Sequence, residues 1–359
     1  MEIRNETTIA RIKILTELHG APNFEDKVRA YLKKEMEPYV DEFVDNRMGG
    51  FFGVKKSNKP SAKRVMIAAH MDEIGFMVTE ITKEGLLKFT NLGGVANDIW
   101  QGQRLRVRTR DDKELTGVVS NIPKHYRTGK EGAPAISDLM LDIGCASPEE
   151  VREMGVEIGD SIVPDTTFKQ LTEHRYLAKA WDNRYGCVLA LEILDLLKDV
   201  DLDVDLYVGA NVQEELGLRG ARASSELIDP DVSFVVDCSP ANDMKGKSGL
   251  SGALGEGTLI RIKDGTMMLK PEFRDYLLDI ANNENIPHQY YMSPGGTDGG
   301  EIHKSNIGVS TAVIGVCARY IHSTDALFDL RDYFAARQLL QHAILNLNDD
   351  TIKTLQYGK

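Results

Sequence analysis

VMIAAHMDEIGFMV, residues 65–78, has five apolar residues among its first six and then places His70, Asp72 and Glu73 close together. An unbroken apolar run of this length is typical of a strand that is buried on both faces. Histidine and carboxylate side chains are costly to bury without partners. Their position directly after the run indicates that the strand ends at a site where polar groups are used.

Similar apolar runs recur along the chain and alternate with segments whose apolar residues have helical spacing. Strands and helices in this order predict an α/β fold, with a mostly parallel sheet and helices on both of its faces. The expected strands are two short ones around the turn at 46–50, then 64–69, 203–211, 232–237 and 309–317, and the expected helices are 7–18, 24–37, 183–198, one after Pro271, and a final one at 331–348.

The region from about 74 to 165 has a different texture. Short alternating runs such as RLRVRT and GVVSNI are separated by Gly, Asp and Pro, which is typical of a β-rich unit. Its clear helix is short and begins with Ser147 as N-cap and Pro148 in the first position. We therefore expect a barrel-like domain at 74–165, inserted into a catalytic domain made of residues 1–73 and 166–359.

Composition argues against some classes of partner. The chain has 359 residues and a net charge of −12, with no Lys/Arg-rich cluster, so we expect neither nucleic acid nor an anionic membrane as partner. No apolar stretch approaches the roughly 20 residues of a membrane-spanning helix. The first residues lack the apolar segment of a secretory leader. Four separate cysteines without a CxxC pair favour buried thiols in a reducing, cytoplasmic setting.

Polar residues follow the expected strands or open the helix after them. The carboxyl ends of parallel strands lie along one edge of a sheet, where ligands bind in such folds. Seven groups crowded at that edge would repel each other or take up protons unless positive charge were present, and metal ions supply such charge. The seven residues are His70, Asp72, Asp182, Glu214, Glu215, Asp237 and His322.

Several of these residues also have a purely structural explanation. Asp182 could cap the helix that follows it, and Glu214 and Glu215 could be acidic residues favoured in a first helical turn. His70 could be a hydrogen-bonded core histidine, and Asp237 could begin an ordinary turn. These explanations are independent, and all of them would have to hold at the same edge. We therefore favour a metal site.

Charge counting favours two ions. Asp182, Glu215 and Asp237 carry three negative charges, two divalent ions bring four positive charges, and a hydroxide bridging the ions would make the total zero. Mixed histidine and carboxylate ligands suit Zn, Co or Mn better than Ca or Mg. His70 and Asp72 are two residues apart, so on an extended strand both side chains share a face. Asp72 could then accept a hydrogen bond from the ring nitrogen of His70 that binds no metal.

Glu214 and Glu215 are adjacent, so their side chains point in different directions. One should bind metal, and the other should face the attacking water as general base. The residue pattern alone leaves both assignments open.

Six segments together resemble the glutamyl aminopeptidases of the tetrahedral aminopeptidase family, which use two co-catalytic metal ions. No single segment is specific, since GGTDGG alone could be a generic glycine loop. In combination they cover nearly the whole chain and follow the order of the family. The segments are AHMDEIGFMV, KAWDNRYG, NVQEELGLRGA, VVDCSPAND, GGTDGG and VCARYIHS.

The resemblance implies a ligand set. His70 and Asp237 match the residues that bind one ion, and Asp182 matches the residue that bridges both ions. Glu215 and His322 match the residues that bind the other ion. Two departures from the family pattern, EELG for EEVG and GGTDGG for GGTDAG, remove no ligand.

The resemblance also implies a reaction. Glu214 matches the general base, and Asp72, expected behind His70 from its spacing, is counted with it among the catalytic residues. The implied enzyme is a metallo-aminopeptidase that removes the N-terminal residue, with Glu or Asp preferred, from short peptides. Family members use a β-rich insertion for assembly, here 74–165, and commonly form dodecamers built from dimers.

Other functions remain open from the residues. A broad or neutral aminopeptidase would use the same chemistry, and a deacylase or glucanase could be built on the same scaffold. An acidic preference requires a cation near the metals. Arg319 lies three residues before His322, about 10 Å along an extended chain. It could equally form a structural salt bridge, and Arg261 and Lys304 are the other candidates.

Overall fold

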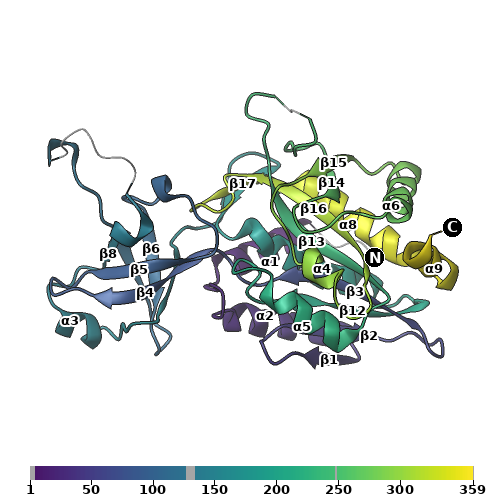
Figure 1. Cartoon of the computed structure of the whole chain (residues 1–359), viewed down its shortest axis with the longest axis horizontal. Helices are drawn as coiled ribbons and strands as arrows, with labels where there is room; N and C mark the ends of the chain where they lie inside the picture. Colours follow the sequence, from purple (N-terminus) through teal and green to yellow (C-terminus); the bar gives the residue numbers. More distant parts are fainter. Residues whose placement is uncertain (1–4, 127–133, 247–248, 359) are drawn as a thin grey trace.

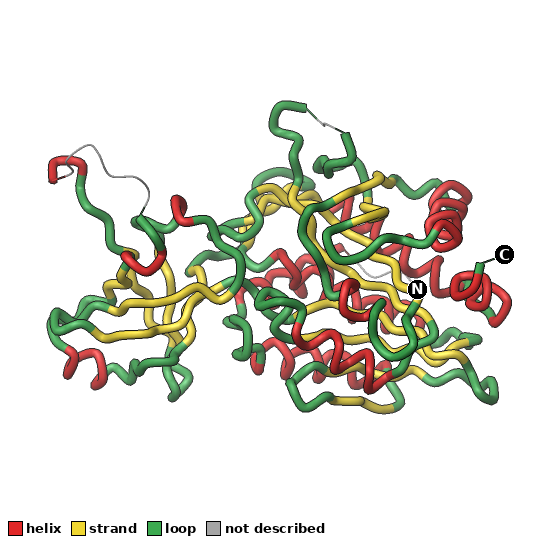
Figure 2. Tube along the Cα trace, in the orientation of Figure 1, coloured by secondary structure: helices red, strands yellow, loops and turns green. Residues whose placement is uncertain are grey.

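The computed structural model describes residues 5–126, 134–246 and 249–358. It has two lobes, an α/β lobe that contains both described ends of the chain and a smaller β lobe that projects from it (Figure 1). The α/β lobe is built on one large sheet and the small lobe on a second sheet (Figure 2). The predicted fold class, α/β with an added β barrel, is confirmed.

The large sheet has a parallel centre and antiparallel flanks. Its centre pairs β12 with β3, β3 with β13 and β13 with β16, all in parallel, as predicted. The strand order is β1 (Glu42–Asp45), β2 (Phe51–Lys55), β12 (Val204–Asn211), β3 (Lys63–His70), β13 (Val232–Pro240), β16 (Ser310–Arg319), β17 (Ala326–Asp329), β11 (Arg175–Ala178) and β10 (Lys169–Gln170), with β14 (Thr258–Lys263) pairing with β16 and with β15 (His288–Met292).

The central strand β3 shows why the apolar run is unbroken. Val65 and Ile67 belong to the core on one face of the sheet, while Met66 and Ala68 belong to the core on the other face. Both faces are therefore covered by helices, and the strand has no solvent side that would accept alternating polar residues.

Helices cover the two faces unequally. One face carries the larger core and packs against α1 (Asn5–Glu17), α2 (Asp26–Met36), α4 (Trp181–Leu197), α6 (Pro271–Asn283), α8 (Leu330–Leu345) and α9 (Asp349–Tyr357). The other face packs against α5 (Arg219–Ile228) and α7 (Gly299–Ile302). None of the helices in the described ranges combines the length and the apolar character needed to cross a bilayer.

The small lobe is a closed barrel with its own core. Phe76, Phe89 and Trp100 pack edge to face inside it, with ring centroids 4.9 Å and 4.8 Å apart. The order around the barrel is β4 (Gly75–Ile81), β5 (Leu87–Leu92), β8 (Met140–Asp142), β7 (Glu114–Val119), β6 (Arg104–Arg108) and β9 (Ser161–Pro164). Its helix α3 (Pro148–Glu153) is capped by Ser147, whose hydroxyl accepts the N–H of Glu150, as predicted. Short 3-10 turns occur at Glu37–Tyr39, Asn97–Ile99, Lys124–Tyr126 and Ile136–Asp138.

Two expectations about the end of the chain were wrong. The strand β16 is followed by another strand, β17, and the helix expected at 331–348, which is α8, is not the final one, because α9 follows it. α8 ends at Leu345, and the side chain of Asn348 accepts the N–H of Thr351 and so caps the start of α9. β17 has four residues and pairs with the preceding strand β16 and with the distant strand β11, and such a short segment gives little local signal.

Candidate metal centre

The candidate residues meet where the central strands end. His70 is the last residue of β3, and Asp237 lies in β13. Asp182 lies in the first turn of α4, where its backbone is not helical. The other candidates follow strands: Glu214 and Glu215 lie in the turn after β12, and His322 lies in the turn after β16.

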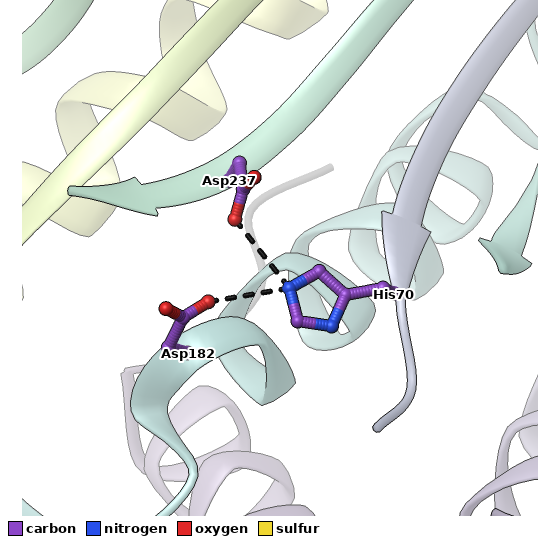
Figure 3. A group of neighbouring side chains, drawn as sticks. All are labelled: His70, Asp182 and Asp237. Carbon is purple, nitrogen blue, oxygen red and sulfur yellow. Dashed lines mark ion pairs between the residues drawn. The ribbon is translucent and has the colours of Figure 1, made fainter. Parts of the chain in front are cut away.

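The first candidate metal group, the His70 group, consists of His70, Asp182 and Asp237. The His70 Nε2 atom lies 3.3 Å from Oδ1 of Asp182 and 3.5 Å from Oδ1 of Asp237. Figure 3 shows both carboxylates pointing at the same nitrogen of the ring. The three side chains come from β3, α4 and β13, so the sheet and the helix packed on it place them together.

The second candidate metal group, the His322 group, consists of Asp182, Glu215 and His322. The His322 Nε2 atom lies 3.3 Å from Oδ2 of Asp182 and 3.3 Å from Oε1 of Glu215. Asp182 belongs to both groups and directs one carboxylate oxygen to each histidine. This arrangement is the one expected of a bridging carboxylate.

The outer ring nitrogens of both histidines are held by main-chain carbonyls. Nδ1 of His70 lies 3.1 Å from the carbonyl oxygen of Asp72, and Nδ1 of His322 lies 2.7 Å from the carbonyl oxygen of Gly94. A carbonyl can only accept, so each Nδ1 carries the proton and a neutral ring has its lone pair on Nε2. Lone pairs directed at carboxylate oxygens repel unless a cation lies between them, so the donor set fits divalent ions.

The charge balance of the group supports the same conclusion. Oδ1 of Asp182 is buried, and no donor among the described residues makes a hydrogen bond to it. Burial opposes the charged form of His322, but the negative charges of Glu215 and Asp182 outweigh this effect and raise its pKa to about 11. The carboxylates therefore demand positive charge at Nε2, either a proton or a metal ion.

Glu214 stands apart from both groups. One of its carboxylate oxygens lies 3.9 Å from Nε2 of His70, and its side chain lines a cavity of about 340 Å³ that opens over the two groups. Burial raises the pKa of Glu214 well above its usual value, and the charges of Asp237 and Glu215 add to the rise. The carboxylate is therefore placed beside the metal groups without belonging to either.

Asp72 has a different contact from the one expected. Its carboxylate accepts the backbone N–H groups of Glu214 and Glu215, each at 3.0 Å, while its Oδ1 lies 3.4 Å from Nδ1 of His70. The expectation assumed an extended strand through residue 72, but β3 ends at His70. The main chain of Asp72 therefore lies nearer the ring, and its carboxylate holds the turn that carries the two glutamates.

The three candidate cations are placed very differently. Arg261 is 3% exposed and lines the cavity over the metal groups. Arg319 donates from Nε to Asp243 at 2.6 Å, and the exposed Lys304 pairs with Glu301 at 2.8 Å. Neither Arg319 nor Lys304 is among the residues that line this cavity.

The sequence reasoning missed a buried ion network behind the site. Lys179 lies 2.6 Å from Glu73, and Arg184 lies 3.2 Å from the same carboxylate, with all three side chains buried. Arg184 also donates to the main-chain oxygens of Met71 and Gly20. The residues lie within the segments AHMDEIGFMV and KAWDNRYG, so charged residues inside otherwise apolar motifs were the available signal.

Comparison with known proteins finds similar aminopeptidases over most of the chain. A family model described as M42 glutamyl aminopeptidase matches residues 49–339. A glutamyl aminopeptidase of Lactococcus lactis subsp. cremoris is 42% identical over 352 residues, which cover 96% of this chain and 98% of the relative. A lysyl aminopeptidase of Pyrococcus furiosus is 33% identical over 327 residues, which cover 89% of this chain and 92% of the relative.

Solved structures agree with this likeness. A TET aminopeptidase from a marine sediment archaeon of the Thaumarchaeota superposes with a TM-score of 0.93 at 33% identity, covering 98% of this chain and 99% of that chain. The TET1 peptidase of Pyrococcus horikoshii can assemble into a tetrahedron or a large octahedral shell. It superposes with a TM-score of 0.86 at 27% identity, covering 95% of this chain and 100% of that chain.

Proposed function

The chain belongs to the M42 glutamyl aminopeptidase family, and from this membership we propose that it removes an N-terminal Glu or Asp from short peptides with the help of two divalent metal ions. Membership makes it an aminopeptidase, a hydrolase of peptide bonds. The proposal adds the metal ions, the roles of the side chains, the acidic preference and the assembly.

The observation that carries the metal proposal is the position of Asp182. Its two carboxylate oxygens each lie 3.3 Å from the Nε2 atom of a different histidine, His70 or His322. Asp237 completes the His70 group and Glu215 completes the His322 group. Three protein ligands per ion leave a position open for water or substrate, as in catalytic sites. We assign Zn, Co or Mn to these positions.

The reaction follows from what lines the cavity. When bound, the two ions supply positive charge that polarises the scissile carbonyl and makes a nearby water acidic near neutral pH. Glu214 accepts the proton of the attacking water and passes it to the leaving amine. Asp72 holds the turn that carries Glu214 through the two backbone N–H groups that its carboxylate accepts. We assign the base to Glu214 and the metal ligand to Glu215, because of these two glutamates only Glu215 belongs to a candidate metal group.

For the acidic preference we favour Arg261 over Arg319 and Lys304. Arg261 donates to Asp264 at 3.1 Å and to the hydroxyl of Ser239 at 2.8 Å, which fixes the guanidinium in the wall of the cavity. Its buried Nε–H makes no hydrogen bond to any described residue. A substrate carboxylate in the cavity would be a second acidic partner of this guanidinium beside Asp264, and such charge-assisted bonds are among the stronger ones in proteins.

The specificity is the least constrained part of the proposal, because relatives differ. One relative is named a glutamyl aminopeptidase and another a lysyl aminopeptidase. A lysine side chain beside Arg261 would meet a like charge, which disfavours that substrate class here. A broad or neutral aminopeptidase is the alternative with the same chemistry.

We further propose that residues 74–165 form an inserted domain used for assembly into a dodecamer built from dimers. The barrel strands β4 to β9 supply none of the five candidate ligands, and the barrel projects from the α/β lobe (Figure 1). Identical subunits in a closed shell with tetrahedral rotational symmetry number twelve, and the TET1 relative assembles into a tetrahedron.

One experiment tests the proposal as a whole. Purified protein is assayed on reporter substrates with N-terminal Glu, Asp, Leu, Ala and Lys, and on an N-acetylated Glu peptide, with and without chelator and added Zn, Co or Mn. We expect cleavage of Glu and Asp substrates, loss on chelation, recovery on metal addition and no cleavage of the acetylated peptide. A glucanase needs only a carboxylate pair, so activity on a glucan that survives chelation would support that alternative instead.

A further inference from the structure

In the turn that carries Glu214 and Glu215, three consecutive backbone N–H groups donate hydrogen bonds to two carboxylates. Asp72 accepts the N–H groups of Glu214 and Glu215, each at 3.0 Å. The N–H of the preceding residue, Gln213, donates to Oε1 of Glu25 at 3.1 Å. Glu25 comes from a distant part of the chain, directly before α2, and is 6% exposed.

Glu25 also joins two residues that have left-handed backbones. The same oxygen accepts the N–H of Asn23 at 2.9 Å, and the side chain of Gln213 donates to the side chain of Asn23 at 3.3 Å. Asn23 has φ +72° and Gln213 has φ +55°, a left-handed backbone conformation that residues other than Gly rarely adopt. Such backbone positions persist only where the surrounding contacts hold them. Glu25 is the contact common to both.

We propose that Glu25 is a positioning residue for catalysis: by accepting the N–H of Gln213 it sets the direction in which the turn presents Glu214 to the cavity. The inference rests on the proposed role of Glu214 as general base. Glu25 does not line the cavity and belongs to neither metal group, so it acts only through the turn.

The contact makes a specific demand on the side chain at position 25. A single oxygen, Oε1, accepts both N–H groups, so we expect the acceptor to matter more than the negative charge. Glu25→Gln keeps a carbonyl oxygen at the same reach. Glu25→Asp keeps the carboxylate but is one methylene shorter, and Glu25→Ala removes the acceptor. The glutamine variant should therefore keep its kcat while the aspartate variant loses it. If the negative charge were what mattered, the aspartate variant would keep its kcat and the glutamine variant would lose it.

Asp332 offers a matched control. It is fully buried, and its carboxylate accepts the backbone N–H groups of Gly255 at 2.8 Å and Gly257 at 2.7 Å. It therefore shares the burial and the type of contact of Glu25, but it holds a different loop. Asp332→Ala should lower the thermal unfolding temperature as Glu25→Ala does, while changing kcat by less than about twofold.

The test measures kcat, KM, bound metal and thermal unfolding in the full chain on a Glu reporter. Glu25→Ala and Glu25→Asp should lower kcat by roughly 10-fold to 100-fold, because small displacements of catalytic groups are costly, with KM and metal content nearly unchanged. Glu25→Gln should stay within about threefold of the natural chain. If the alanine variant does not fold, the aspartate and glutamine pair carries the test.

Three results would overturn the inference. Glu25→Gln could be as impaired as Glu25→Ala, which would assign the effect to charge. Asp332→Ala could lose kcat to the same extent, which would assign it to general stability. In a Glu214→Gln background, Glu25→Ala should add no further loss of kcat, and a full additional loss would show that it acts elsewhere. Retained kcat in Glu214→Gln alone would instead reject the proposed role of Glu214.

Discussion

The carbonyl oxygen of Gly94 lies 2.7 Å from Nδ1 of His322, so a loop that follows barrel strand β5 orients a residue in the turn after β16 in the other lobe. The neighbouring Gly93 lies close to Glu215, another member of the same group. A methyl group on Gly93 would lie 3.3 Å from Cβ of Glu215. The barrel therefore contacts the His322 group directly, whereas the three residues of the His70 group belong to β3, β13 and α4.

Gly93→Ala should weaken one metal position. Gly93 has φ +107°, and an added methyl group would lie 2.9 Å from Ile74, so the loop must shift away from Glu215 and His322. Titration of metal-free protein by calorimetry should show at least roughly tenfold weaker binding of one ion, with the other unchanged. Gly94→Ala is the control, because its methyl group would come only within 3.8 Å of the His322 ring. Equal effects of the two variants would contradict this prediction.

Asp182→Ala should abolish the binding of both ions, because each oxygen of this carboxylate serves a different group. Asp237→Ala is the comparison, since Asp237 belongs to the His70 group alone and should weaken mainly one ion. Elemental analysis after dialysis counts the bound metal in each variant. An Asp182→Ala protein that retains two ions would show that the site is misassigned.

Glu214→Gln should keep both ions and lose most of kcat, because an amide cannot take a proton from water. KM for a Glu reporter should change little, as expected for a group that acts mainly in the transition state. The measurement pairs steady-state kinetics with metal analysis of the same preparation. Near-normal kcat in this variant would exclude Glu214 as the base.

Arg261→Met should cut kcat/KM for Glu and Asp reporters by roughly tenfold to a hundredfold, since a charge-assisted hydrogen bond is worth about 1.5–3 kcal/mol. Leu and Ala reporters should change little. Arg319→Met is the control, because Arg319 is not among the residues that line the cavity and should leave the ratio of Glu to Leu activity unchanged. A ratio that moves with Arg319 and not with Arg261 would reverse the assignment.

Deleting residues 76–163 with a short linker should give smaller species by light scattering, if the barrel makes the contacts between subunits. The same variant lacks Gly93 and Gly94, so it should also bind one ion more weakly. Gly93→Ala, which changes the loop alone, separates the two effects because it should leave the assembly intact. A large assembly that survives the deletion would place the contacts in the α/β lobe.

The α/β fold could be predicted from the sequence, and so could the proximity of the residues that form the two candidate metal groups. The run at 65–69 is apolar on both faces because helices cover both sides of β3. Burial on both faces requires apolar residues at every position, so it can be recognised from the residue types alone. Polar residues after such runs then mark the edge of the sheet where strands end. His70 and Asp237 lie at that edge because β3 and β13 run in parallel side by side.

The tertiary structure alone decided how those residues are held. The acceptor for His322 is a main-chain carbonyl of Gly94, which has no side-chain signal, and the partner of Gln213 is Glu25, a residue 188 positions away. Arg261 lines the cavity because β14, which carries it, pairs with β16. Arg319 instead forms an ion pair with Asp243 and is not among the residues that line the cavity. Residue types and local periodicity report burial, but the orientation of a side chain depends on backbone contacts between distant segments, for which the local sequence carries no pattern.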